Sequence, residues 1–264
     1  MELLQFCRII LIFISWMGYC RILSKKTDIN MLFAPAIVMS SQMLIMFFAG
    51  ILNMMMAFTL LLFICGLLLF VFQARKEGLK AFFAPFCSAG FAFFIIAATA
   101  YYIASRKANV NSYDDFTHWA LIVKQMLTDN RYPNFENIIM FQAYPPGSAS
   151  FIYYFCTLSG GGEGIWIYAQ GLLELAFILP IFVFCSRKYS LPCIAYCLLF
   201  ANYIMCTLHL NQSLYVDILL ALSGAAAMLF VWYYLRENVV RERERERDFV
   251  TFMRCSPACG LCSD

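Results

Sequence analysis

Charged side chains are scarce in this chain. They make up 13% of its 264 residues, while 62% are hydrophobic, and an average soluble domain carries roughly 25% charge. This deficit excludes an ordinary soluble fold. The formal net charge of +3 is too small to indicate nucleic-acid binding. The sequence shows no alternation of apolar and polar residues of the kind found in β-barrels. Apolar helices are therefore expected to make the backbone hydrogen bonds inside lipid.

Histidine is scarcer still, and the cysteines form no obvious framework. The chain has two histidines and twelve cysteines. His118 has no nearby cysteine or second histidine at ligand spacing, which argues against zinc there. Nine cysteines are scattered, mostly within apolar runs, and we interpret them as small apolar filler. The N-terminal run lacks a small-residue cleavage site before Cys20, which favours a retained span over a cleaved signal.

Seven apolar runs approach the roughly 20 residues that span a bilayer. They cover residues 3–22, 31–51, 54–73, 81–104, 165–185, 190–208 and 214–235. The sequence therefore predicts an all-α, polytopic integral membrane protein with about 6–8 transmembrane helices, multi-pass in a bacterial plasma membrane. The predicted organisation is an N-terminal helical region (1–104), an outer loop (105–148), further membrane helices (149–235) and a charged tail (236–264).

Basic residues predict the orientation, because positively charged short loops stay cytoplasmic. Arg21, Lys25 and Lys26 follow the first span, and Arg75, Lys76 and Lys80 separate the third from the fourth. Arg187 and Lys188 follow the 165–185 span, and Arg236 with the arginines of 241–247 follows the 214–235 span. These assignments alternate if residues 148–159, too short to cross comfortably, dip in and return or lie in the interface. Loop 105–148 then faces outward. If residues 148–159 cross, the later charges fall on the wrong side.

The outer loop opens with the sequence Tyr113-Asp114-Asp115-Phe116-Thr117-His118-Trp119. In a helix, both aspartates lie three or four residues from His118 and share a face with it. Apolar residues recur at helical spacing, which predicts an amphipathic helix lying on the membrane surface; they are Phe116, Trp119, Val123, Met126 and Leu127. The helix is expected to end by Asn130-Arg131-Tyr132-Pro133.

Two adjacent carboxylates at a membrane interface suit two kinds of chemistry. One can act as a general base towards an acceptor hydroxyl. Both can help to hold a divalent metal, Mg²⁺ or Mn²⁺, through oxygen ligands. The alternative stays open that Asp114 and Asp115 only stabilise a helix N-terminus and that His118 only faces water.

Acids inside the apolar runs add two further candidates, because intramembrane carboxylates are costly and often functional. Asp217 lies just inside the last span, and the predicted topology puts it on the same side as Asp114. Glu174 is deeper, and a buried structural role is equally open to it. The sequence Tyr144-Pro145-Pro146-Gly147 predicts an extended segment followed by a turn.

The order of these pieces resembles the GT-C superfamily of membrane glycosyltransferases, which includes protein mannosyltransferases and aminoarabinose transferases of lipid A. Members typically carry an Asp-Asp or Asp-Glu pair on a short membrane-parallel helix in an outer loop, and Asp114 and Asp115 match that pair. A Pro-rich turn followed by aromatic residues often comes next. Tyr144-Pro145-Pro146-Gly147 leading into Phe151, Tyr153 and Tyr154 is similar to it. The resemblance covers about residues 105–235.

The resemblance implies a polyprenyl-phosphate sugar donor and a cell-envelope acceptor. It implies direct displacement at the anomeric carbon, with the acceptor proton passing to Asp114, and basic partners for the lipid phosphate. No sugar-nucleotide pocket is then needed, in keeping with the lack of any soluble α/β region. The predicted catalytic groups are Asp114, Asp115 and His118, with the two aspartates also as metal ligands. The predicted substrate-binding groups are Trp119, Lys124, Arg131, Tyr144 and Asp217, although Lys124 and Arg131 can equally be ordinary solvated residues.

The tail differs in composition from the rest of the chain. Residues 241–248 alternate charge strictly, which predicts a solvated helix. Cys255, Cys259 and Cys262 have a spacing similar to the cluster motif of radical SAM enzymes. Such enzymes need a long barrel, but two residues follow here. A local three-thiolate metal site is an alternative, and we interpret the tail as the truncated end of a longer membrane protein.

Two rival functions stay open at this stage. One is a transporter or flippase of lipid-linked sugars that uses Asp217 and Glu174 as intramembrane charges. The other is an inactive, truncated membrane protein. The transporter hypothesis expects polar groups clustered at mid-membrane, and the sequence has few.

Overall fold

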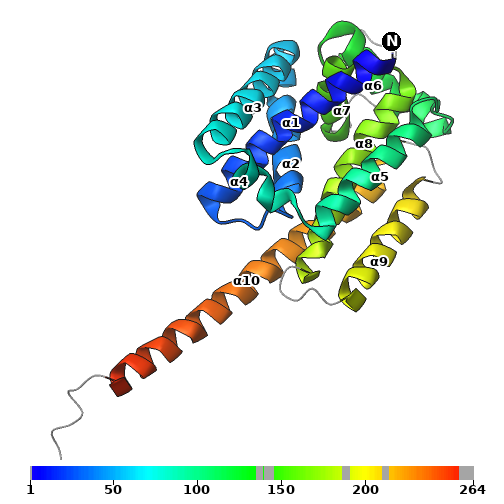
Figure 1. The fold of residues 1–264 in the computed structure, drawn as a ribbon. Helices are drawn as coiled ribbons and strands as arrows, with labels where there is room; N and C mark the ends of the chain where they lie inside the picture. Colours follow the sequence, from blue (N-terminus) through cyan, green and yellow to red (C-terminus); the bar gives the residue numbers. More distant parts are fainter. Residues whose placement is uncertain (1, 135–138, 140–145, 186–190, 210–213, 256–264) are drawn as a thin grey trace, which may run out of the picture. The chain divides into compact units, whose positions relative to one another are not determined.

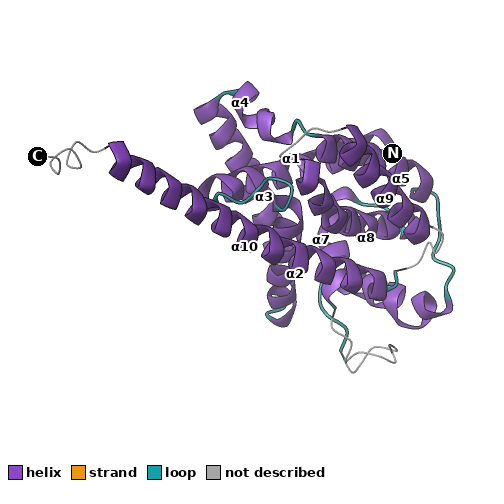
Figure 2. Ribbon diagram, turned by 90° about the horizontal axis from the view of Figure 1, so that it is seen from below, coloured by secondary structure: helices purple, strands orange, loops and turns teal. Residues whose placement is uncertain are grey.

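The computed structural model describes residues 2–134, 139, 146–185, 191–209 and 214–255. All regular elements among these residues are helices (Figure 2), which confirms the predicted all-α fold. Within this part of the chain, five helices are long and apolar enough to cross a membrane, or six if one bent pair counts as a span. The protein is thus a multi-pass helical membrane protein, and the count of six to eight spans stays a prediction.

The N-terminal region contains α1 (Glu2–Thr27), α2 (Ala34–Ile51), α3 (Met55–Glu77), the short α4 (Leu79–Phe83), a 3-10 turn (Ala84–Phe86) and α5 (Ala89–Ser105). The run predicted at 81–104 is broken, because its two helical pieces meet at 83°. Pro85 lies in the turn, where a ring without an N–H ends the helix. Ser88 caps α5 by accepting the backbone N–H of Phe91 at 3.4 Å.

The second region begins with a π-helical turn (Asp115–Trp119) that leads into α6 (Ala120–Asp129). It continues with α7 (Gly147–Ser159), α8 (Glu163–Ile178), a 3-10 segment (Leu179–Cys185), α9 (Leu191–His209) and α10 (Val216–Cys255). The chain divides into two compact units, residues 1–226 and 227–264. In the second unit the helix runs through the charged stretch, and the Arg236 guanidinium lies 5.3 Å from the Trp232 ring centre. Cys259 and Cys262, part of the alternative metal site in the tail, lie outside the described residues.

Helices of the first unit form two groups, α1 to α4 on one side and α5, α8 and α9 on the other, with α7 between them (Figure 1). Helix α7 packs against α1, α2, α3 and α8. Its residues 151–155 are at most 1% exposed. The rings of Phe151 and Phe155 stack on Trp16 of α1 at 5.8 and 5.9 Å. This aromatic helix therefore lies within the core of the first unit.

Helix α7 is short, and its two ends contact α2 and α1. Thirteen helical residues measure about 20 Å, less than the roughly 30 Å of a bilayer core. The first turn of α7 contacts the C-terminal half of α2, where Gly147 faces Met43. Its end meets the first turns of α1, where Gln5 Nε2 donates to the Gly160 carbonyl at 2.9 Å. Residues 147–159 thus form one unbroken helix that is too short to cross comfortably, and whether they dip in and return stays a prediction.

Small residues allow α1 and α3 to cross in close contact, a common device in membrane helix pairs. A Cβ at Gly18 would lie 2.7 Å from the Phe70 backbone nitrogen, and one at Gly66 would lie 2.7 Å from the Ser15 carbonyl oxygen. The Ser15 hydroxyl donates to the Phe63 carbonyl at 3.0 Å. Near the other end of this pair, Glu77 accepts hydrogen bonds from Arg21 and, at 2.9 Å, from Lys25.

Candidate functional site

The polar loop begins with the segment of residues 112–119, here called the acidic segment, and its helix has an unusual first turn. The N–H of Ala120 bonds to the Asp115 carbonyl, five residues back. Such π-turns add a residue to the helix and are frequent at functional sites. The segment is helical, as predicted, but the π-turn changes which side chains share a face. Asp115 is fully buried and Asp114 half-buried, while Phe116 is 60% exposed.

Asp115 joins the acidic segment to the residues just before α10. Its Oδ1 accepts the backbone N–H of Leu214 at 3.0 Å, within the protein interior. Beside it, the Ser112 hydroxyl donates to Tyr215 Oη at 2.9 Å, and Gln170 Nε2 of α8 donates to the Tyr215 carbonyl at 2.8 Å. These contacts give Asp115 a positioning role. They also place the beginning of α10 next to the polar loop, as the predicted topology requires.

His118 is buried at 8% exposure, so the alternative in which it only faces water is wrong. Its Nδ1 lies 2.8 Å from the Thr117 hydroxyl. Its ring is tilted by 56° against the Trp119 ring, with 4.8 Å between the centres. Thr117 also donates to the Asp114 carbonyl at 3.3 Å. The imidazole is therefore held within the turn that carries both acids.

The remaining predicted residues differ in their surroundings. Lys124 is exposed, and Arg131 is exposed with its Nε 3.9 Å from Asp129 Oδ2. Asp217 is exposed in the first turn of α10, two residues after the anchored Tyr215. Tyr144 lies outside the described residues.

The surface helix predicted after the acidic segment packs differently from the expectation. Val123 and Met126 of α6 are 1% and 0% exposed, and α6 packs against α7. These two residues of the apolar stripe therefore face protein rather than a membrane surface. The helix ends, as predicted, at Asn130, which adopts a left-handed φ of 54° and accepts a hydrogen bond from Tyr153 Oη at 2.7 Å.

Tyr132 is an anchor that sequence reasoning missed. Its ring lies against Gly50 of α2, where a Cβ would be 2.7 Å from the Tyr132 Cε1. Its hydroxyl lies 2.8 Å from Ser150 Oγ of α7 and donates to the Phe47 carbonyl at 3.2 Å. Burial raises the pKa of Tyr132 above its usual value, which keeps the hydroxyl protonated as a donor. A tyrosine followed by a proline gives no sequence signal for a partner 82 residues away.

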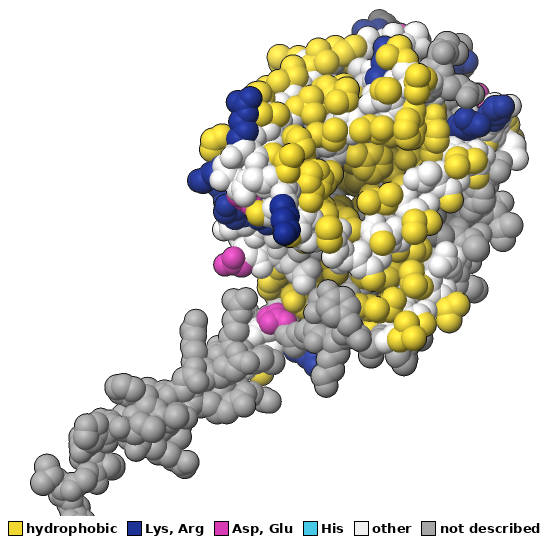
Figure 3. Space-filling model, in the orientation of Figure 1, with side chains coloured by type: hydrophobic (Ala, Val, Ile, Leu, Met, Phe, Trp, Pro, Cys, Tyr) yellow, Lys and Arg dark blue, Asp and Glu magenta, His cyan; other side chains and the backbone are white. Residues whose placement is uncertain are grey.

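An apolar groove opens on the side of the bundle, here called the lateral groove. It lies between α1, from Phe6 to Cys20, and α5, from Phe91 to Tyr102, and has a volume of about 360 Å³. Along α1 this corresponds to about 21 Å. Met39 of α2 contributes to the lining, which is almost wholly apolar. Figure 3 shows a hollow within the yellow, apolar face, with Lys and Arg side chains near its margins.

Comparisons of the chain with protein-family models, curated proteins and solved structures give no match. The resemblance to GT-C glycosyltransferases therefore rests on the residues and their arrangement alone.

Replacing Asp115 with alanine is expected to lower the free energy of unfolding by about 1–3 kcal/mol, because the buried N–H of Leu214 loses its acceptor. Thermal unfolding in detergent measures the loss, and faster hydrogen exchange at the Leu214 amide locates it. Asp217→Ala, at an exposed position of the same region, is the matched control. Equal stability of Asp115→Ala and wild type would contradict the anchoring role.

Proposed function

We propose that this protein is a GT-C-like membrane glycosyltransferase of a bacterial plasma membrane. It transfers a sugar from a polyprenyl-phosphate donor to a cell-envelope acceptor hydroxyl. The observation that carries the proposal is the acidic segment, in which Asp114, Asp115 and His118 are folded into one π-helical turn and bound to the start of a membrane span. Unusual helical geometry and buried polar groups together are typical of functional sites.

The lateral groove supports a lipid-linked donor. It lies between two helices of the membrane bundle and is lined by apolar side chains over most of the length of α1. An isoprenoid chain that leaves the bilayer can bind there without exposing polar groups of the protein. Phe6 and Tyr102 lie at one end of the groove. Ser105, near that end of α5, borders Gly164 at the start of α8. The neighbouring Glu163 accepts a hydrogen bond from the backbone N–H of Val110, in the loop that leads to the acidic segment.

The proposed reaction is a single displacement. The acceptor hydroxyl gives its proton to the Asp114 carboxylate as its oxygen bonds to the anomeric carbon. The bond from that carbon to the phosphate oxygen breaks, and the polyprenyl phosphate leaves with the electron pair. Asp115 acts as a positioning residue, because Leu214 occupies one of its oxygens.

A metal step is not part of this mechanism. Among the described residues, no third carboxylate, histidine or cysteine joins the acidic pair within reach of a common ion. Mg²⁺ and Mn²⁺ favour several oxygen ligands, and a requirement for either stays a prediction that chelation during the assay tests.

The decisive experiment is transfer by the purified protein in lipid nanodiscs, with a radiolabelled sugar on polyprenyl phosphate and membrane-extracted acceptors. Labelled acceptor in the presence of wild-type protein supports the proposal. An absence of transfer with every donor, together with movement of lipid-linked sugars across vesicles that depends on Glu174, would favour the flippase. Glu174 is buried in α8 at 6% exposure, as that rival expects.

The groove gives a separate prediction. Thr99→Phe is expected to weaken binding of a fluorescent polyprenyl phosphate about tenfold, or by about 1.4 kcal/mol, because the added ring occupies part of the groove that Thr99 lines. Ile96→Phe is the control, since Ile96 is 68% exposed on the same helix and does not line the groove. Equal binding by Thr99→Phe and Ile96→Phe would place the lipid chain elsewhere.

A further inference from the structure

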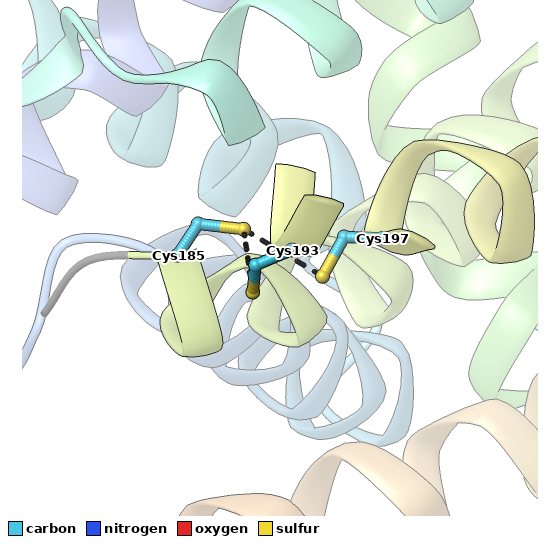
Figure 4. Close-up of side chains that lie close together, drawn as sticks. All are labelled: Cys185, Cys193 and Cys197. Atoms are coloured by element: carbon cyan, nitrogen blue, oxygen red, sulfur yellow. Dashed lines mark hydrogen bonds between the residues drawn. The ribbon is translucent and has the colours of Figure 1, made fainter. Parts of the chain in front are cut away.

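Three cysteines converge at the link between α8 and α9, here called the thiol cluster: Cys185, Cys193 and Cys197 (Figure 4). Cys185 ends the 3-10 segment after α8, and the other two lie one turn apart in the first turns of α9. The Sγ of Cys185 is 3.7 Å from that of Cys193 and 3.6 Å from that of Cys197. All three sulfur atoms lie within 4.8 Å of one another.

We propose that the thiol cluster is a metal site that binds one Zn²⁺ ion through three thiolates. Zinc–sulfur bonds are about 2.3 Å long and tetrahedral, which separates the sulfur atoms by about 3.8 Å. The two distances from Cys185 already agree with this spacing, so an ion can bind with little movement of the backbone. Within the described part of the chain, this is the group of three or more His, Cys, Asp or Glu side chains that could hold a metal ion.

Burial favours Zn²⁺ over Cu⁺. Cys185 and Cys197 are 3% and 1% exposed, and Cys193 is partly exposed. Three thiolates leave a net charge of −1 with Zn²⁺ but −2 with Cu⁺, and burying charge is costly. The partly exposed side next to Cys193 leaves room for the ion to enter and for water as a fourth ligand.

Without a metal ion, the thiols of the cluster make hydrogen bonds within the protein. Metal binding must replace these hydrogen bonds. Cys193 donates to the Phe184 carbonyl and Cys197 to the Ile181 carbonyl, at 3.6 and 3.7 Å. Binding of Zn²⁺ replaces the three S–H protons with three Zn–S bonds and releases those protons to solvent. The ion would then tie α9 to the 3-10 segment Leu179–Cys185, with which α9 makes its main described contacts.

The predicted cellular compartment of the thiol cluster also favours a thiolate site over a disulfide. The connection after Cys185 carries Arg187 and Lys188 in the sequence, which predicts a cytoplasmic position. The cytosol keeps thiols reduced. In the sequence, the spacing of four between Cys193 and Cys197 was the available signal, but Cys185 joins them through a break between helices that periodicity does not show.

The test is titration of the full chain, purified under reducing conditions, with Zn²⁺ and with Co²⁺ as the spectroscopic substitute. To separate the thiol cluster from the tail cysteines, the reference protein carries Cys255→Ser, Cys259→Ser and Cys262→Ser. This reference is expected to bind one ion per chain, with thiolate-to-Co²⁺ charge-transfer absorption, and Zn²⁺ is expected to raise its unfolding temperature.

Adding Cys197→Ala to the reference is expected to weaken binding by more than about 100-fold, the upper figure for losing even a second-shell partner. Cys156→Ala, at a buried cysteine of α7, is the control for folding and should bind like the reference. Three results would overturn the proposal: no Zn²⁺ binding by the reference, equal binding by Cys197→Ala, or tighter binding of Cu⁺ than of Zn²⁺. A disulfide within the cluster, detected by alkylation and mass spectrometry of intact cells, would also overturn it.

Discussion

Replacing Asp114 with asparagine is expected to lower the rate of sugar transfer by about 10²–10⁴-fold, the usual contribution of general base catalysis. Asparagine keeps the size of the side chain and one acceptor oxygen but cannot take up the proton of the acceptor hydroxyl. Asp114 is half-buried, whereas its neighbour Asp115 is buried against Leu214. The loss should therefore appear in the turnover rate, with little change in donor binding or in unfolding temperature. Transfer from a radiolabelled polyprenyl-phosphate sugar in nanodiscs measures it.

Asp28→Asn is the matched control for Asp114→Asn. Asp28 lies in the link between α1 and α2, at the end of α1 away from Gln5 and Gly160, with a left-handed φ of 55° that asparagine tolerates. It should transfer sugar at the wild-type rate. Full activity of Asp114→Asn would remove Asp114 from the mechanism, and an equal loss in Asp28→Asn would indicate a general effect of charge.

Replacing Gly18 with leucine is expected to destabilise the protein by more than about 3 kcal/mol, the upper end of the cost of overpacking. Even a Cβ at this position would lie 2.7 Å from a backbone nitrogen of α3, and backbone atoms cannot rotate away as a side chain does. The two helices must therefore separate, which also breaks the hydrogen bond from Ser15 to Phe63. Unfolding in detergent and loss of folded protein from membranes measure the effect.

Gly224→Leu provides the control for the helix crossing. Gly224 lies in α10 with open space around its Cβ position, so leucine there should leave stability unchanged or raise it slightly through helix propensity. Similar unfolding temperatures for Gly18→Leu and Gly224→Leu would contradict the close contact between α1 and α3.

The membrane helices could be located from the sequence because the length of an apolar run sets the length of a span. The runs at 31–51 and 54–73 correspond to α2 (Ala34–Ile51) and α3 (Met55–Glu77). The break in the run at 81–104 was missed, because a proline near the start of an apolar run does not reveal how far the chain bends.

Less of the candidate site could be predicted. Local spacing placed the acids and His118 together, and the charge pattern placed the start of α10 on their side. The buried carboxylate of Asp115 accepts a hydrogen bond from Leu214, 99 residues away, and the π-turn has no local sequence signal. Tertiary contacts of that kind override helical periodicity and leave no trace in the local sequence. The assignment of Asp115 to positioning rather than to chemistry thus required the structure.

The hydrogen bond between Asp115 and Leu214 also sets an order of assembly. During synthesis, α7, α8 and α9 must all emerge before the backbone of residue 214 exists. Until then the acidic segment lacks the contact that holds Asp115 inside the protein. A nascent chain therefore carries its polar segment in an unfinished form while most of its spans are already in the bilayer. The contact that buries Asp115 can therefore form only after the start of α10 has been synthesised.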